Sequence, residues 1–228
     1  MVESLVMSAD QPFSDADRLA IYRAIALRRD VRRGFTSRPL PDEILKRLLS
    51  AAHNAPSVGL MQPSRFIVIR NDTTRRAVYD IFKDANAQAR ELYEGDRKEQ
   101  YDSLKLEGIL EAPQNICVVC DTHSQRGHGL GRLSMPETAA YSTVCAIQNL
   151  WLAARAEGIG VGWVSILDPA RLRAVLRIPE HILPVAYLCV GYVEEFGTEP
   201  DLQRAGWEKR VPLETTVFYD FYHAESRP

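Results

Sequence analysis

The chain has 228 residues, and 28 Lys and Arg against 30 Asp and Glu leave a net charge of −2 at pH 7. A near-neutral chain argues against general binding to nucleic acid, and no apolar run approaches the ~18 residues of a membrane span. With 46% hydrophobic residues the chain can bury a substantial core. We expect one domain over residues 1–228, with a loose tail at 1–13 that lacks the order of a signal peptide, and a cytoplasmic location.

The first predicted helix begins at Ser14, which forms a capping box with Asp17, and carries apolar residues between positions 19 and 25. It leads to four arginines within residues 28–33. Because a planar guanidinium makes paired, charge-assisted bonds to phosphate, this cluster in a net-acidic chain indicates a site for one anion. The alternative is a solvated helix end, since cations are favoured at the C-terminus of a helix.

A second helix is predicted over residues 40–52, with Pro41 in its first turn and an apolar stripe on one face. It ends in a breaker-rich loop at 54–59. Two short polar side chains in and after this loop, Ser57 and Gln62, are candidates for binding a ligand. For Ser57 the alternative is a turn-forming role after the preceding proline.

Four apolar runs predict strands, and because they do not alternate with polar residues they indicate a sheet covered on both faces. The runs are 65–70, 115–120, 161–166 and 184–193. Cys117 and Cys120 lie three apart on the second run and should point to opposite faces. We therefore expect free buried thiols rather than a redox pair, and no metal site.

A long helix is predicted from Glu137 to Glu157, started by a capping box at Ser134 and ended by Gly158. It is apolar around most of its circumference, which indicates burial in the core or in a dimer interface. A further helix is predicted after Asp168, its N-cap residue.

Two segments leave alternatives open. The insert at 91–107 is rich in charge and poor in core residues, so it is either a lid over a site or a solvated surface helix. The aromatic segment at 215–222 favours a strand, and an apolar strand at a chain end needs a sheet edge, its own or a partner's. Residues 211–228 are therefore predicted to form an arm that is exchanged between two subunits.

In this order the signals resemble the FMN-binding nitroreductase family, from about residue 16 to residue 217. The resemblance rests on the arginine-rich helix exit, Ala55-Pro-Ser57 with Gln62-Pro63, a buried helix, Gly158-Ile-Gly-Val-Gly-Trp163 and the late pair Lys209-Arg210. Ordinary members usually carry serine where this chain has Asp30. Within the family, the chain is most similar to the branch that produces 5,6-dimethylbenzimidazole from reduced FMN and O2. Three features carry this narrower resemblance: the run at 29–35, the run at 160–165 and the insert ending at 102–107.

The resemblance implies an α+β nitroreductase-like fold with a central mixed sheet flanked by helices. It also implies a domain-exchanged homodimer with one flavin site at each subunit junction. Reduced FMN would be a substrate consumed with O2, with release of erythrose 4-phosphate, and a separate NAD(P)H-dependent flavin reductase would supply it. The alternatives are an NAD(P)H-dependent nitroreductase or flavin reductase, and a non-catalytic flavin-binding carrier.

The resemblance further implies roles for single residues. The arginines at 28–33 would hold the FMN phosphate, with Lys209 or Arg210 closing from the far side. Ser165 would contact the reactive edge of the flavin, the alternative being a cap on the following helix. The insert would close the site, with Leu104 or Leu106 as an apolar cover.

Asp30 and Ser165 are the two candidate catalytic residues. Asp30 is either a general base beside the ribityl chain, which must lose protons during fragmentation, or a salt-bridge partner that orients the arginines. The full set of implied flavin-binding residues is Arg28, Arg29, Asp30, Val31, Arg32, Arg33, Ser57, Gln62, Leu106, Ser165, Lys209 and Arg210.

Overall fold

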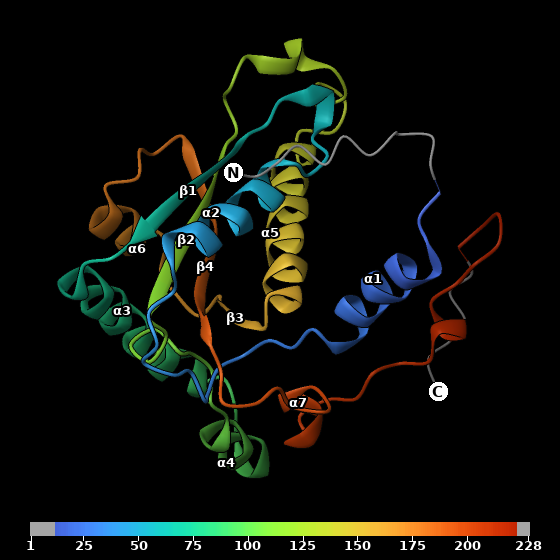
Figure 1. Cartoon of the computed structure of the whole chain (residues 1–228). Coiled ribbons are helices and arrows are strands. Elements are labelled where there is room, and N and C mark those ends of the chain that lie inside the picture. Colours follow the sequence, from blue (N-terminus) through green and yellow to red (C-terminus); the bar gives the residue numbers. More distant parts are fainter. Residues whose placement is uncertain (1–11, 223–228) are drawn as a thin grey trace.

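The computed structural model describes residues 12–222. Four strands form one sheet in the order β1-β2-β4-β3, and each neighbouring pair is antiparallel (Figure 1). The strands are β1 (Ser64–Ile69), β2 (Gln114–Asp121), β3 (Ile159–Val164) and β4 (Ile182–Tyr192). The four apolar runs of the sequence are therefore the four strands, each close to its predicted bounds.

Helices cover both faces of the sheet, as the unbroken apolar runs predicted. Ile116 and Val118 of β2 face a core shared with α2 and α5, whereas the intervening Cys117 and Val119 face a core shared with α3 and α6. Alternate residues of one strand therefore serve two cores, because successive side chains point to opposite faces. The covering helices are α2 (Asp42–His53), α3 (Asp72–Arg90), α5 (Thr138–Ala156) and α6 (Pro169–Leu176).

The strand directions correct one detail of the expected fold, since the sheet is antiparallel rather than mixed. Apolar runs report burial on two faces but carry no information on direction, and helices on both sides bury antiparallel strands equally well. Within residues 12–222 the only parallel pairing is an isolated bridge between Asp30 and Val161, at the free edge of β3.

Cys117 and Cys120 lie in different cores, as their spacing predicted. Cys117 packs on the α3 side of β2, and Cys120 packs with Met61 and Ala139. All four cysteines are free. In the described part of the chain no group of three or more His, Cys, Asp or Glu residues could hold a metal ion. None of the helices between residues 12 and 222 combines the length and apolarity needed to cross a membrane.

The central helix α5 packs between the sheet and α2 (Figure 1). Eight of its residues are buried, which confirms its place in the core. The capping box predicted at Ser134 is wrong, because the helix begins at Thr138 and its N-cap, Glu137, makes no side-chain cap bond. The Thr138 N–H instead donates to the Met135 carbonyl, so the chain enters the helix through a tight turn.

Side-chain caps begin the two helices on the other face. The Asn71 side chain accepts a hydrogen bond from the Thr74 N–H at 3.0 Å ahead of α3. The Asp168 carboxylate accepts from the Arg171 N–H at 2.8 Å ahead of α6, as predicted. Two short helices lie together at the foot of the view in Figure 1, α4 (Gly95–Ser103) and α7 (Asp201–Arg204).

The first helix, α1 (Asp15–Leu27), has the capping box predicted at its start, but its apolar side chains are exposed. None of its residues is buried, and Leu19 and Tyr22 are 60% and 69% exposed. The helix projects from the sheet (Figure 1). Amphipathic spacing favoured a helix here, but it did not determine which surface the apolar side chains pack against.

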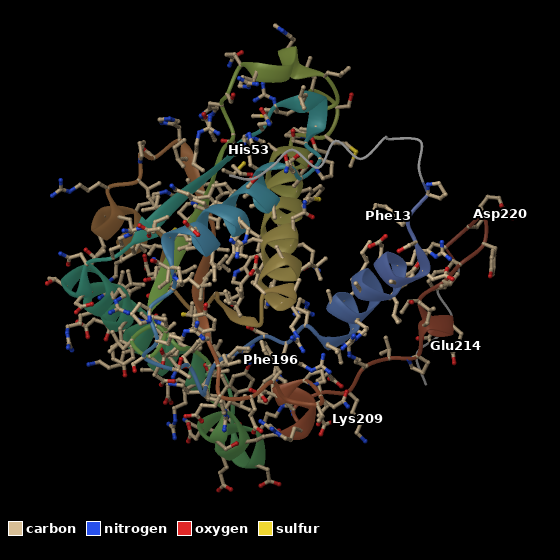
Figure 2. The ribbon with its side chains drawn as sticks, viewed as in Figure 1. Phe13, His53, Phe196, Lys209, Glu214 and Asp220 are labelled. Carbon is tan, nitrogen blue, oxygen red and sulfur yellow. The ribbon has the colours of Figure 1, made fainter. Side chains whose placement is uncertain are left out.

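The C-terminal segment from 211 to 222 contains a short 3-10 helix, η3 (Leu213–Thr215), followed by turns, and not the strand predicted at 215–222. Figure 2 shows Phe13, Glu214 and Asp220 well away from the sheet. No strand of the described chain pairs with this segment, and a strand without a neighbour is not stable in water. Pairing with a second subunit stays a prediction.

Candidate functional site

The arginine segment, residues 28–33, lies directly on the free edge of β3. The N–H of the buried Val31 donates to the Val161 carbonyl at 3.0 Å, next to the bridge made by Asp30. Gly162 permits this approach, because a Cβ atom there would lie 2.0 Å from the Val31 carbonyl oxygen. The arginine cluster and the glycine-rich strand are separate motifs in the sequence. In the structure they therefore pack directly against each other.

Asp30 is held at this edge by both of its carboxylate oxygens. Oδ1 accepts a hydrogen bond from the Trp163 backbone N–H at 3.0 Å, and Oδ2 accepts from the Arg32 guanidinium at 2.5 Å. The Asp30 and Arg32 side chains are only 29% and 15% exposed. The structure therefore shows Asp30 orienting Arg32, while the spare lone pairs of its carboxylate keep the capacity to accept a proton.

A small pocket lies between the arginine segment and the chain around α7. It has a volume of about 130 Å³, and its lining residues are Arg28, Arg29, Asp30, Arg32, Pro200, Asp201, Leu202 and Arg210. Four arginines and two aspartates give this arginine pocket a net formal charge of +2, which balances a phosphate dianion. Because sites for whole drug-sized ligands have volumes of about 300–1,000 Å³, the pocket suits a phosphate group alone. Of the late basic pair, Arg210 lines the pocket and Lys209 does not.

Arg28 and Arg210 approach this pocket from separate segments of the chain. The Arg28 guanidinium lies 4.7 Å from the centre of the Trp151 ring. Burial lowers the pKa of Arg28 from its ordinary value, Asp30 opposes the shift, and Arg210 contributes to it by repulsion. A guanidinium stays charged at neutral pH in spite of such a shift. An anion between Arg28 and Arg210 relieves their repulsion, so the pocket favours an anionic ligand.

Two arginines of the segment are engaged elsewhere. The Arg29 guanidinium donates to the carbonyls of Gly197 at 3.1 Å and Thr198 at 2.7 Å, and so ties the exit of α1 to the chain ahead of α7. Arg33 is largely exposed, and its Nε lies 4.0 Å from an Asp201 oxygen. The structure therefore brings Arg28 and Arg32 to the pocket with free donors, while Arg29 supports its wall.

Ser165 is exposed just beyond the end of β3. The side chain that caps α6 is Asp168, so the alternative role predicted for Ser165 is wrong. With a rise of about 3.3 Å per residue, Ser165 lies about 7 Å along the chain from Trp163, whose N–H holds Asp30. The edge of β3 thus carries both candidate catalytic residues.

The Ser57 loop, residues 54–62, is built by turn chemistry. The Ser57 hydroxyl accepts a hydrogen bond from the Gln62 N–H at 3.0 Å, which is the alternative predicted for this serine. The Gln62 side chain accepts from Arg126 at 3.2 Å. The loop is attached to the N-terminal half of α5, since the Val58 N–H donates to the Ser142 hydroxyl at 3.0 Å.

The arginine segment is attached further along the same helix. The Arg29 carbonyl accepts from the Trp151 indole N–H at 3.2 Å. Nine residues separate Trp151 from Ser142, which corresponds to about 14 Å along the helix axis. Figure 2 shows His53, next to the loop, at one end of the molecule and Lys209 at the other. In one chain the Ser57 loop therefore contributes nothing to the arginine pocket.

Leu106, the predicted cover over the site, is half-buried and packs against the core that contains α3 and α6. The buried Glu107 carboxylate accepts from the Lys105 ammonium at 2.7 Å and from the Ile109 N–H at 2.6 Å. These bonds fix the turn that holds Leu106. The following Gly108 packs so closely on Phe35 that a Cβ there would lie 2.7 Å from its ring.

Sequence reasoning missed Trp151 and Asp201. Trp151 belongs to the helix whose apolar circumference predicts only burial, yet its ring lies against Arg28 and its indole N–H donates to the Arg29 carbonyl. Asp201 lines the pocket and pairs with Arg204 at 2.6 Å. An aromatic residue near the end of a buried helix and an acid after Pro200 are weak signals, because neither spacing places them beside the arginines.

The sequence profile of the Nitroreductase family matches residues 25–192, which include the arginine segment and all four strands. A relative from Rhodospirillum rubrum named 5,6-dimethylbenzimidazole synthase is 49% identical over 185 residues, covering 81% of this chain and 87% of that protein. Another of the same name, from Rhodobacter capsulatus, is 41% identical over 202 residues, covering 89% of this chain and 97% of that protein.

The fold is also similar to that of solved proteins. The crystal structure of oxidised iodotyrosine deiodinase bound to FMN and 3-iodo-L-tyrosine superposes with a TM-score of 0.70 at 21% identity. The superposition covers 89% of this chain and 100% of that one. This likeness confirms the nitroreductase-like α+β fold expected from the sequence.

Proposed function

Because this chain belongs to the nitroreductase family, we propose that it catalyses the oxygen-dependent fragmentation of reduced FMN to 5,6-dimethylbenzimidazole. The observation that carries the proposal is the 49% identity over 81% of the chain to a relative named for that synthesis. The arginine pocket supports it, since a net charge of +2 beside a fixed carboxylate suits a phosphate-bearing substrate whose adjoining carbon chain must lose protons.

Each residue of the pocket has a distinct part in this proposal. Arg28 and Arg210 bind the substrate phosphate, and Arg32 holds Oδ2 of Asp30 in place. Asp30 accepts a proton from the ribityl chain, which a carboxylate does at neutral pH and a serine hydroxyl does not. Ser165 contacts the flavin edge from the end of β3. Reduced FMN itself supplies the carbon chain that is cut and the electrons for O2.

We further propose that the working protein is a homodimer with one flavin site at each subunit junction. The Ser57 loop and the arginine pocket lie at different ends of α5, so a second copy is the source of loop residues for each pocket. The exposed apolar residues of α1 and of the segment 211–222 supply surface for such a dimer. Their exchange between subunits would bury side chains that are exposed within residues 12–222 of one chain.

Reduced FMN is a substrate in this proposal, so a separate NAD(P)H-dependent flavin reductase must supply it from FMN in the cytoplasm. The expected sugar fragment is erythrose 4-phosphate, which keeps the phosphate bound by the arginine pocket. A resident cofactor would be recovered after each turnover, whereas a substrate disappears in proportion to the product.

The test measures whether flavin is consumed as product forms. The purified protein is mixed in air with excess FMN, NADH and a separate flavin reductase, and total flavin and products are followed by absorbance and mass spectrometry. We expect irreversible loss of flavin with formation of 5,6-dimethylbenzimidazole, and none in a mixture that lacks this protein. Full recovery of flavin on reoxidation would refute the proposal, and steady NADH oxidation by the protein alone would favour a reductase.

A further inference from the structure

The helix α4, at the centre of the predicted lid, is fixed firmly to α3. The Arg90 guanidinium makes two bonds of 2.6 Å to the Asp102 carboxylate. The Tyr101 hydroxyl donates to the Asn86 side chain at 2.7 Å, and Tyr101 is only 6% exposed. A helix with a buried aromatic residue and a bidentate ion pair is a rigid support rather than a loose flap.

The other side of α4 holds the chain that follows α7. The Trp207 ring packs edge-on against Tyr93 at 5.3 Å and Tyr101 at 6.1 Å between ring centres, and the Arg97 guanidinium lies 3.9 Å from its centre. The Gln100 side chain donates to the Ala205 carbonyl at 2.9 Å. Aromatic pairs and a cation–π contact of this kind stabilise the position of the ring beyond the burial of its surface.

The segment held by α4 is also the second wall of the arginine pocket. Asp201, Leu202 and Arg210 line that pocket. The Trp207 backbone N–H donates to the Leu202 carbonyl at 2.9 Å, so the residue whose ring packs on α4 is hydrogen-bonded through its main chain to a pocket-lining residue. Only two residues lie between Trp207 and Arg210 in the chain. One short segment therefore has an aromatic contact on its outer side and the anion site on its inner side.

We infer that Trp207 is a positioning residue for phosphate recognition: its packing against α4 holds Arg210 and Asp201 in the wall of the pocket that Arg28 also lines. The inference rests on the proposed function only in taking FMN as the ligand. Arg28 and Arg210 repel each other, and the segment 201–210 is short, so the wall needs support from outside the pocket. The rings of Tyr93, Tyr101 and Trp207 supply that support, so the position of α4 fixes the position of the pocket wall.

The test compares FMN with riboflavin, which lacks only the phosphate, by titration calorimetry on the oxidised ligands. We expect Trp207→Ala to weaken FMN affinity about tenfold while changing riboflavin affinity less than about twofold. Trp207→Phe keeps an aromatic ring and should restore most of the FMN affinity. Thermal unfolding of each variant shows that it is folded.

A surface variant keeps the test decisive if Trp207→Ala does not fold. Arg97 is exposed, so Arg97→Ala removes the cation–π contact without disturbing the core, and we expect a loss of FMN affinity of about threefold. Arg38→Ala is the matched control, because Arg38 lies 3.9 Å from the centre of the Tyr192 ring and does not line the pocket. It should leave FMN affinity unchanged.

Three outcomes overturn the inference: unchanged FMN affinity in Trp207→Ala, equal losses for FMN and riboflavin in Trp207→Ala, or no preference for FMN in the unaltered protein. Both measurements use binding without turnover, so they are independent of the proposed reaction. If the unaltered protein forms no 5,6-dimethylbenzimidazole but Trp207→Ala weakens FMN affinity more than riboflavin affinity, the proposed function is refuted and this inference stands. If the unaltered protein forms 5,6-dimethylbenzimidazole and Trp207→Ala leaves FMN affinity unchanged, the proposed function stands and this inference is refuted.

Discussion

At the scale of single residues, Asp30 combines two tasks that the sequence could not separate. Its carboxylate bonds the Trp163 N–H with one oxygen and Arg32 with the other. Asparagine keeps the first bond but presents an amide group to Arg32. We expect Asp30→Asn to abolish product formation and to weaken FMN binding about tenfold, because a charge-assisted bond contributes about 1.5–3 kcal/mol. Calorimetry with FMN and the product assay measure the two effects, and product at the normal rate would remove Asp30 from the chemistry.

Gly162 is the residue on which the docking of the arginine segment depends. A Cβ atom would lie 2.0 Å from the Val31 carbonyl oxygen, so Gly162→Ala must push the segment off β3 and break the bond from Val31 to Val161. We expect a loss of about 3 kcal/mol in the free energy of unfolding, measured with urea, together with loss of FMN binding. Gly95→Ala is the control, since a Cβ there meets no atom within 4 Å and only its positive φ costs about 1 kcal/mol.

At the scale of elements, α1 is a helix whose apolar side chains are largely exposed within residues 12–222. Ile25 is 49% exposed and Tyr22 69% exposed. If a second copy covers them, Ile25→Asp places a charge in the interface, and we expect it to convert a dimer to a monomer in sedimentation experiments. Leu92→Asp makes the same change at an 81% exposed position on another part of the surface and should leave the dimer intact. A dimer that survives Ile25→Asp would exclude α1 from the interface.

The strand β2 carries a buried thiol with a consequence for stability. Burial raises the pKa of Cys117 to about 12, from an ordinary value of 9.0. The unfolded chain therefore releases this proton near pH 9 while the folded chain retains it. The contribution of this pKa shift to the free energy of unfolding is fully present below pH 9. Above pH 9 that contribution falls by up to about 1.4 kcal/mol per pH unit. Urea unfolding at several pH values should show a flatter alkaline decline for Cys117→Ala than for the unaltered protein, and identical slopes would contradict the assignment.

At the scale of the whole molecule, the position of the Ser57 loop decides whether the flavin site belongs to one chain or two. Arg28→Ala and Gln62→Ala should each abolish product formation in a homodimer. In a mixed dimer, one junction receives both defects and the other is intact. Random mixing should therefore restore product formation to about a quarter of the unaltered rate. A mixture no more active than its components would place the whole site in one chain.

Much of the fold followed from the sequence for clear physical reasons. The four strands are continuous apolar runs, and their position between helices follows from burial on both faces. The caps at Ser14 and Asp168 follow from hydrogen bonds within four residues of the chain. The cap predicted at Ser134 failed because a nearby proline turn competed with it locally. Strand direction was missed because apolar runs do not encode it.

The sequence by itself determined which residues can serve the site, because guanidinium, carboxylate and glycine each have chemistry that no other residue supplies. It also determined the elements, since these depend on short-range periodicity and local hydrogen bonds. Only the tertiary structure decided that Arg29 supports the wall while Arg28 and Arg210 line the pocket. Only the structure separated the Ser57 loop from that pocket and connected α4 to the pocket wall through Trp207. These relations depend on segments about 180 residues apart in the chain, such as those of Arg28 and Arg210, which line one pocket, and no local pattern records such proximity.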